Sequence, residues 1–271
     1  MSVLWNSDWG SISAAEQALL TSYRFDAQTF ELLRAKLRAG LFPLKHNRVL
    51  ANPEPLHRQA LNDFQSADRA RLAHWLRLGQ QALDSGQVAA IILNGGMATR
   101  FGGRVKGVGE VLPGKSFLAL KLGTRLCKNV SLLNSFATHT ATCAHLRDRE
   151  FLSSHEMHLQ TLQQSISVRL REDGSVFRDA TGCLSFYAPG HGDLLAVLHN
   201  SPILRSFESH GGRYLMVSNV DNLLATVDPE ILGAHIDSGK AVTVEVAERQ
   251  ANDTGGAPVD LDGKPQILEG M

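Results

Sequence analysis

A glycine-rich stretch with basic side chains is the first part of this sequence whose residue types could do chemistry. Residues 93–107 read LNGGMATRFGGRVKG and directly continue an uninterrupted apolar run. Glycines let the backbone come close to phosphate groups and point successive N–H groups at them. Long cationic side chains add charge-assisted hydrogen bonds to phosphate oxygens. The stretch therefore predicts a phosphate-binding loop, in which the candidate cations are Arg100, Arg104 and Lys106.

Three other interpretations of this region exist. The glycines could form a flexible surface loop, and their spacing does not fit the GxGxxG pattern of dinucleotide-binding folds. Residues 109–116, GEVLPGKS, satisfy the P-loop pattern GxxxxGK[ST] literally. A P-loop must follow a buried strand, however, and residues 102–108 are rich in glycine and cations. We therefore expect Pro113 and Gly114 to form a hairpin turn instead.

The elements that must position the loop follow an alternating pattern. Residues 88–93 read VAAIIL, without polar alternation, which is typical of a fully buried parallel strand. Strands and helices then alternate along the chain, which predicts a mostly parallel α/β sheet flanked by helices, with the strand carboxyl ends along one edge. The further strands expected are Val130–Leu133, Tyr214–Val217 and Ala241–Val246. The helices expected are Thr138–Arg147, Ser154–Gln163, Leu194–His210 and Pro229–Ser238.

The first third of the chain is predicted to be helical. Residues 13–39 are expected to form one helix, capped by Ser13 with Glu16 three residues later and stopped by Gly40. A second helical stretch is expected over residues 56–84, after a proline-rich connector. We therefore expect a helical N-terminal segment, residues 1–87, followed by an α/β domain, residues 88–271.

Composition excludes several classes of function. The 271 residues include 27 Lys and Arg and 27 Asp and Glu, so the formal net charge is zero and favours neither nucleic acid nor an anionic membrane as a partner. Three cysteines without a CxxC pair indicate neither a disulfide framework nor a structural zinc site. Without a recognisable signal peptide or a long apolar span, the expected compartment is the cytoplasm.

Short motifs, met in order along residues 93–269, resemble the signatures of the UDP-sugar pyrophosphorylases, especially the UTP–glucose-1-phosphate uridylyltransferases. They are LNGGxxTR at 93–100 with Lys106 after it, NSF at 134–136, the segment from Gln164 to Arg169, PGHGD at 189–193, NVDNL at 219–223, GGAP at 255–258 and the turn DGK at 262–264. The sequence departs from the family pattern at Leu162, where members have Phe, at Val168, where they have Pro, and at Ala98, where many have Gly.

The resemblance implies a Rossmann-like nucleotidyltransferase sheet and a reaction. An oxygen of a sugar 1-phosphate, with glucose 1-phosphate as the family's usual substrate, attacks the α-phosphorus of UTP and expels pyrophosphate. Such an in-line displacement needs positioning and charge neutralisation more than a covalent nucleophile.

The resemblance also implies residue roles. Backbone groups of the glycine loop hold the nucleotide, Gln164 bonds uracil, and Lys106 neutralises phosphate charge. Asp221 holds Mg²⁺, which prefers few carboxylates together with phosphate oxygens. The nucleotide-binding residues implied are Leu93, Asn94, Gly95, Gly96, Lys106, Gln164 and Gly190. The catalytic residues implied are Lys106, Arg100 and Asp221, and the substrate-binding residues are His191 and Asn219.

Each of these residues has a simpler interpretation. His191 could be a solvated loop residue, Gln164 a surface amide, and Asp221 the cap of a turn. Asp193 is expected to cap the helix that begins at Leu194 rather than to bind a ligand.

The resemblance does not extend to the sugar side of the site. Members of the family are longer, and beyond the position of Glu269 they continue with strands that complete the sugar side of the cleft. We therefore expect the nucleotide side of a site here and little of the sugar side. Two hypotheses follow: a uridylyltransferase of which this chain is an N-terminal part, or a short form that binds UTP or a UDP-sugar without turnover. A P-loop kinase is a distant alternative.

Overall fold

The chain forms two compact units. The computed structural model describes residues 9–42, 49–57, 60–96, 105–124, 127–147, 157–248, 250 and 255–269. The first unit comprises Met1–Leu41 and Ala82–Val227, and the second comprises Phe42–Gln81 and Asp228–Met271. Among the helices of the described residues, none has the length and apolar character needed to cross a bilayer.

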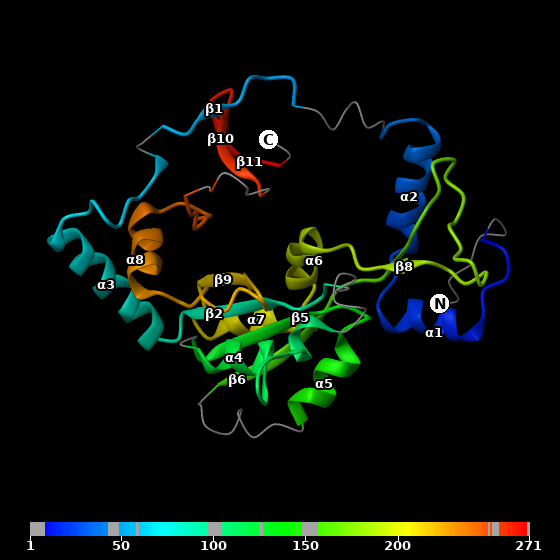
Figure 1. Cartoon of the computed structure of the whole chain (residues 1–271), viewed down its shortest axis with the longest axis horizontal. Helices are drawn as coiled ribbons and strands as arrows, with labels where there is room; N and C mark the ends of the chain where they lie inside the picture. Colours follow the sequence, from blue (N-terminus) through cyan, green and yellow to red (C-terminus); the bar gives the residue numbers. More distant parts are fainter. Residues whose placement is uncertain are drawn as a thin grey trace. The chain divides into compact units, whose positions relative to one another are not determined.

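A four-stranded parallel sheet organises the first unit (Figure 1). Its strand order is β6 (His158–Gln163), β5 (Asn129–Asn134), β2 (Val88–Leu93) and β9 (Tyr214–Asn219). The register places Leu93 opposite both Leu133 and Asn219, and Asn134 opposite Gln163. The four strands therefore end together, which confirms the predicted parallel sheet and puts the loops that follow them along one edge.

Helices lie against both faces of this sheet. On one face, Ile91, Leu133 and Leu162 share a core with α6 (Leu194–His199) and with partly buried side chains of α7 (Pro202–Ser209). Successive side chains of a strand point to opposite faces. Accordingly, Asn94 turns to the other face and bonds Thr142 of α5 (His139–Arg147).

The predicted hairpin turn is confirmed. Strands β3 (Glu110–Leu112) and β4 (Lys115–Ser116) pair antiparallel, and Gly114 takes a φ of 71° between them. Ser116 then caps α4 (Phe117–Gly123) by accepting the N–H of Ala119. Because β3 is short and exposed, the GxxxxGK[ST] pattern here does not have the buried strand that a P-loop requires.

The predicted single helix over residues 13–39 is wrong. The structure has two helices, α1 (Ala14–Ser22) and α2 (Ala27–Arg38), although the capping box of Ser13 and Glu16 is present as expected. Arg24 takes a left-handed φ of 53°, and this turn brings Phe25 against Trp9 and Phe30. The chain therefore breaks because an aromatic cluster forms at the corner.

The α1–α2 pair belongs to the first unit. Leu20 of α1 and Phe30 of α2 form one core with Trp9, which precedes α1, and with the segment from Ile166 to Leu184. That segment includes β7 (Ser167–Val168) and leads to β8 (Phe186–Tyr187). The compact units therefore do not follow the boundary expected after residue 87, because burial joins this helical pair to a segment about 140 residues later in the sequence.

Three further expectations about elements are wrong. Within the range predicted as a helix, 154–163, residues 154–156 lie outside the described residues, and His158–Gln163 is strand β6 because it pairs with β5. The helix expected over 194–210 is two helices, because Ser201 and Pro202 start a new one with Ser201 as its cap. Residues 241–246 form no strand, and Val242, Val244 and Val246 are exposed.

Among its described residues, the second unit contains most of one long helix, a second helix and a small sheet. The range expected to be helical, 56–84, contains α3 (Arg69–Asp84), which enters this unit, while α8 (Pro229–Ser238) matches its prediction. A Cβ at Gly79 would overlap the Pro229 backbone, and Trp75 donates to Asp237 at 3.0 Å, so the two helices are in close contact. An antiparallel sheet has the order β1 (Glu54–Pro55), β10 (Ala257–Leu261) and β11 (Lys264–Leu268), with the expected turn at residues 262–264.

Candidate nucleotide site

The carboxyl edge of the parallel sheet collects most of the residues that the sequence singles out. Leu93 and Asn219 end adjacent strands, and the Val220 N–H donates to the Leu93 carbonyl at 3.1 Å. On the other side, the Asn94 N–H donates to the Leu133 carbonyl at 2.9 Å, and the Gln164 N–H to the Asn134 carbonyl at 2.8 Å. Backbone hydrogen bonds thus tie the first residues of three of these loops, Asn94, Gln164 and Val220, to the ends of neighbouring strands.

Asn94 supports the loop with its side chain. Its Nδ2 donates to Asn134 Oδ1 at 2.8 Å and to Thr142 Oγ1 at 2.9 Å, and the residue is buried. A Cβ at Gly107 would overlap the Asn94 Oδ1 atom. The Asn94 side chain is therefore committed to the protein, so within Leu93–Gly96 it is the backbone that remains for contact with a nucleotide.

Gln164 carries a buried acceptor that has no partner in the described part of the chain. Its Nε2 donates to the Gly190 carbonyl at 2.7 Å, whereas its Oε1 is buried without a hydrogen bond. The orientation of the amide follows from chemistry, because a carbonyl oxygen accepts only from the NH₂ group. A buried acceptor left unpaired costs about 1–3 kcal/mol, so this atom is a candidate acceptor for a ligand.

Gly95 packs against this amide so closely that a side chain would not fit. A Cβ at Gly95 would overlap the Gln164 Oε1 atom, whereas a Cβ at Gly96 or Gly190 would meet nothing within 4 Å. Gly190 also takes a φ of 88°, a conformation that favours glycine. The segment at Gly95 therefore needs glycine because it passes directly beside the Gln164 amide.

Lys106 and Asp221 form an ion pair next to this row. Lys106 lies in the short 3₁₀ helix η5 (Lys106–Val108), and its Nζ is 2.8 Å from Asp221 Oδ2. The side chains are 31% and 36% exposed, so the pair contributes little to stability and its groups remain open to a ligand. The structure thus brings together the predicted phosphate-neutralising cation and the predicted metal-binding carboxylate, 115 residues apart in the sequence.

In the loop with the sequence PGHGD, the side chain of Asp193 does not make the helix-capping hydrogen bond that the sequence predicts. His191 begins the short 3₁₀ helix η7 (His191–Asp193) and is exposed. Asp193 occupies the cap position of α6, but its side chain makes no cap hydrogen bond. Instead its Oδ2 accepts the Ser165 N–H at 2.9 Å. The expected cap is therefore wrong, because the carboxylate ties this loop to the segment that carries Gln164.

Two more of the predicted site residues are Asn219 and Arg100, of which the structure describes only the first. Asn219 is exposed at the end of β9, and its carbonyl accepts the Asn222 N–H at 3.2 Å. Arg100, predicted to be catalytic, lies outside the described residues.

Lys121 is a residue near this edge that the sequence did not indicate. It lies on α4, is fully buried, and donates from Nζ to the carbonyls of Asn222 and Ala225. Burial lowers the pKa of its ammonium group. Its neighbours in the sequence, FLALKLG, read as an ordinary apolar helix, so no local signal marks it.

A magnesium ion fits this edge only together with a ligand. Within the described residues, no group of three or more His, Cys, Asp or Glu side chains could hold a metal ion. Asp221 offers one carboxylate, and Mg²⁺ typically uses one or two carboxylates with phosphate oxygens and water. The residues present therefore fit a magnesium ion carried by a nucleotide.

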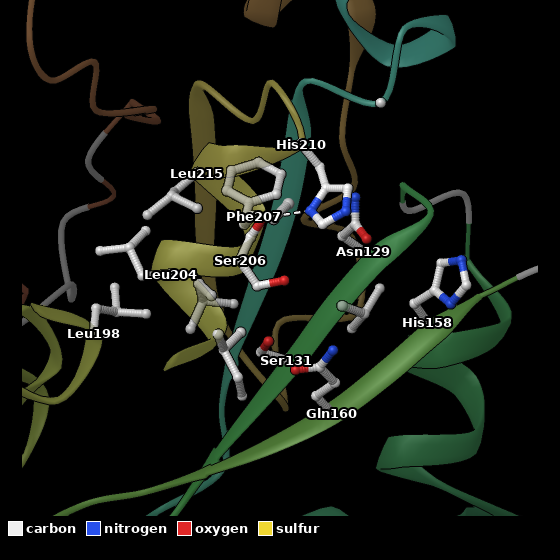
Figure 2. A pocket seen from close by; sticks show the side chains of 15 residues that line it. Asn129, Ser131, His158, Gln160, Leu198, Leu204, Ser206, Phe207, His210 and Leu215 are labelled. Carbon is white, nitrogen blue, oxygen red and sulfur yellow. Dashed lines mark hydrogen bonds between the residues drawn. The ribbon is translucent and has the colours of Figure 1, made fainter. Parts of the chain in front are cut away.

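A separate pocket lies near the other end of the strands (Figure 2). It has a volume of about 120 Å³ and lies between the first residues of β5 and β6, such as Asn129 and His158, and side chains of α7 such as Phe207. His210 points into it and bonds the Ser206 carbonyl at 2.7 Å. Typical ligand pockets measure about 300–1,000 Å³, so this pocket is too small for a nucleotide.

Comparisons with known proteins show the family to which the chain belongs. Residues 45–271 match the family model described as UTP–glucose-1-phosphate uridylyltransferase. The chain is 34% identical over 196 residues to a probable UTP–glucose-1-phosphate uridylyltransferase of Schizosaccharomyces pombe and 35% identical over 196 residues to the enzyme of Saccharomyces cerevisiae. Both matches cover 68% of the chain, but only 38% and 39% of those proteins.

Solved structures show the same fold. The chain matches a UDP-N-acetylglucosamine pyrophosphorylase of Trypanosoma brucei in complex with an inhibitor, with a TM-score of 0.78 and 22% identity over 97% of the chain and 57% of that protein. It matches a mutant UDP-glucose pyrophosphorylase of Leishmania major in complex with UDP-glucose, with a TM-score of 0.61 and 23% identity over 96% of the chain and 56% of that protein. The chain thus spans little more than half of these structures.

Proposed function

Because the chain belongs to the UTP–glucose-1-phosphate uridylyltransferase family, we propose that it binds UTP at the carboxyl edge of the parallel sheet. We propose further that it takes part in the transfer of UMP from UTP to a sugar 1-phosphate, which the family name indicates to be glucose 1-phosphate. The observation that carries the proposal is the buried, unpaired Oε1 of Gln164 beside the glycine loop.

The uracil end of the nucleotide is recognised by this amide. Uracil N3–H is a donor, and Gln164 Oε1 is an acceptor without a partner in the described residues. The Gly190 carbonyl accepts from Nε2, which fixes the orientation of the amide and leaves the buried Oε1 as the atom that would accept from a ligand. Cytosine has no hydrogen on N3, so the same site discriminates against CTP.

The phosphate end is held by Lys106 and Asp221. In the free chain these two side chains neutralise each other at 2.8 Å. Asp221 would hold a magnesium ion that arrives with UTP, and Lys106, released from Asp221, would bond phosphate oxygens. Bound magnesium supplies charge neutralisation to the phosphates. An oxygen of the sugar 1-phosphate forms the new bond to the α-phosphorus, and the bond to the pyrophosphate oxygen breaks.

Nucleotide titration of the full chain tests the binding site. We expect UTP with Mg²⁺ to bind at least about tenfold more tightly than CTP with Mg²⁺, which is the scale of one hydrogen bond to a buried polar group. Gln164→Met keeps the length of the side chain, removes the acceptor and should abolish this preference. Lys115→Met is the control, because Lys115 is an exposed residue of the β3–β4 hairpin. Equal affinity of the unaltered chain for UTP and CTP would refute the site.

Turnover separates the two forms of the proposal. The full chain is incubated with Mg²⁺–UTP and glucose 1-phosphate, and pyrophosphate release is measured. Release that requires both substrates supports the uridylyltransferase. Tight UTP binding without pyrophosphate release supports the alternative, a UTP-binding or UDP-sugar-binding module without turnover.

A further inference from the structure

Lys121 is a charged side chain in a place where charge is costly. The residue has no exposed surface, and it lies on α4 among apolar neighbours. An ammonium group removed from water is expensive unless other groups solvate it. In the part of the chain that the structure describes, its partners are two backbone carbonyls, those of Asn222, at 2.7 Å, and Ala225.

Both carbonyls belong to the loop that follows β9. This loop contains Asp221 and is folded tightly on itself. The Asn222 N–H donates to the carbonyl of Asn219, the last residue of β9, and the Ala225 N–H donates to Asn222 Oδ1 at 3.2 Å. Its carbonyls at 222 and 225 point inward to Lys121. An ammonium group has three donors, so it can satisfy both.

Two lysines from neighbouring segments therefore hold one loop. Lys106 of η5 contacts the Asp221 side chain, and Lys121 of α4 contacts the backbone one and four residues further on. The Lys106 contact is partly exposed and open to exchange for a ligand, whereas the Lys121 contact is buried. The first contact can change when a nucleotide binds, and the second stays fixed.

We propose that Lys121 is a positioning residue, which fixes the loop after β9 so that the Asp221 carboxylate meets the magnesium ion of bound UTP. The inference rests on the proposed function, because it assigns Asp221 to the Mg²⁺–triphosphate end of that site. Without the ammonium group, the Ala225 carbonyl loses this donor and the Asn222 carbonyl keeps only the Ala225 N–H at 3.4 Å, so the loop relaxes. Asp221 then loses its fixed place, while the Gln164 end of the site keeps all of its own contacts.

The experiment compares the two ends of the site in one protein. Binding of Mg²⁺–UTP, of UTP with EDTA, and of uridine is measured for the full chain and for Lys121→Met, a side chain of similar length without donors. We expect Lys121→Met to lower the gain in UTP affinity that Mg²⁺ provides by about tenfold, the scale of a hydrogen bond to a charged group. Uridine affinity should stay unchanged. Lys121→Arg, which retains charge and donors, should recover part of the magnesium effect.

Lys115→Met is the matched control, because it removes the same charge from an exposed hairpin position. If Lys121→Met does not fold, as judged by circular dichroism, Lys121→Gln is tested in its place, since its amide keeps a donor and loses only the charge. The same selective loss of the magnesium effect is expected for that variant.

The outcomes separate this inference from the proposed function. A chain that binds neither UTP nor Mg²⁺–UTP would overturn both. A chain that binds Mg²⁺–UTP, with an unchanged magnesium effect in the folded Lys121 variant, would overturn the role of Lys121 alone. An equal loss of uridine and Mg²⁺–UTP affinity would overturn it as well, because a residue that only stabilises the fold weakens both ends.

Discussion

Gly95 offers a sharp test of how closely the glycine loop is fitted to Gln164. A Cβ built on Gly95 overlaps Gln164 Oε1 and lies 3.0 Å from Gln164 Cδ, whereas a Cβ on the adjacent Gly96 meets nothing within 4 Å. Gln164 is buried and held through Nε2 by the Gly190 carbonyl. Gly95→Ala therefore pushes the amide away from Gly190 and breaks that hydrogen bond.

The expected loss of stability follows from the groups involved. Losing the bond leaves a polar group without its partner at a cost of about 1–3 kcal/mol, and strain from an extra methyl group in a packed site is of the same order. We expect Gly95→Ala to lower the free energy of unfolding by about 2 kcal/mol. Gly96→Ala should be neutral or stabilise by about 0.4–1 kcal/mol, because alanine restricts the unfolded chain.

Urea denaturation followed by tryptophan fluorescence gives both free energies of unfolding. The double variant Gly95→Ala/Gln164→Ala removes the overlapping amide, so it should lose less stability than the sum of the two single variants. If Gly95→Ala proves as stable as Gly96→Ala, or if the double variant is strictly additive, the contact between the loop and Gln164 does not exist as described.

Two further predictions concern titrating groups. Asp26 caps α2, and its hydrogen bonds to Thr29 lower the pKa of its carboxyl group from the ordinary 3.8, so its stabilisation is present above pH 3.8 and is lost as the pH falls through the lowered value. Asp26→Ala should cost about 1 kcal/mol at pH 7, and the difference in urea midpoint from the unaltered chain should vanish in strong acid. Burial raises the pKa of the Cys127 thiol from 9.0 to about 11, which lowers its thiolate fraction near pH 8 about 100-fold. Alkylation followed by peptide mapping should therefore label the exposed Cys183 well before the partly buried Cys127, and equal rates would contradict the raised pKa of the Cys127 thiol.

Local sequence patterns correctly predict those elements whose structure is decided by their own residues. The apolar run Val88–Leu93 is a buried strand with the predicted bounds, and Pro229–Ser238 is a helix, with Asp228 as its cap and Gly239 after its end. Pro113 and Gly114 make the predicted hairpin. Each of these signals is a matter of side-chain polarity, capping or backbone freedom within a few residues.

Local patterns failed where pairing between distant segments decides. Residues 158–163 were predicted as part of a helix, yet they form a strand because β5 offers a partner at the sheet edge. Residues 241–246 have a strand-like pattern but pair with no strand in the described residues. The aromatic corner at Phe25 divides a stretch whose capping and apolar spacing predict one continuous helix.

The same division applies to the candidate site. The sequence by itself indicated the glycine loop and Lys106 as phosphate-binding candidates. Its resemblance to the family added Gln164 and Asp221 as candidates, because the order of short motifs along the chain is a property of the sequence. Only the tertiary structure decided what these residues do to one another: it paired Lys106 with Asp221, left Gln164 Oε1 without a partner in the described residues, and placed Lys121 beneath the loop after β9. The physical reason is that hydrogen bonds and burial depend on distances across the sheet, and the register of four strands sets those distances.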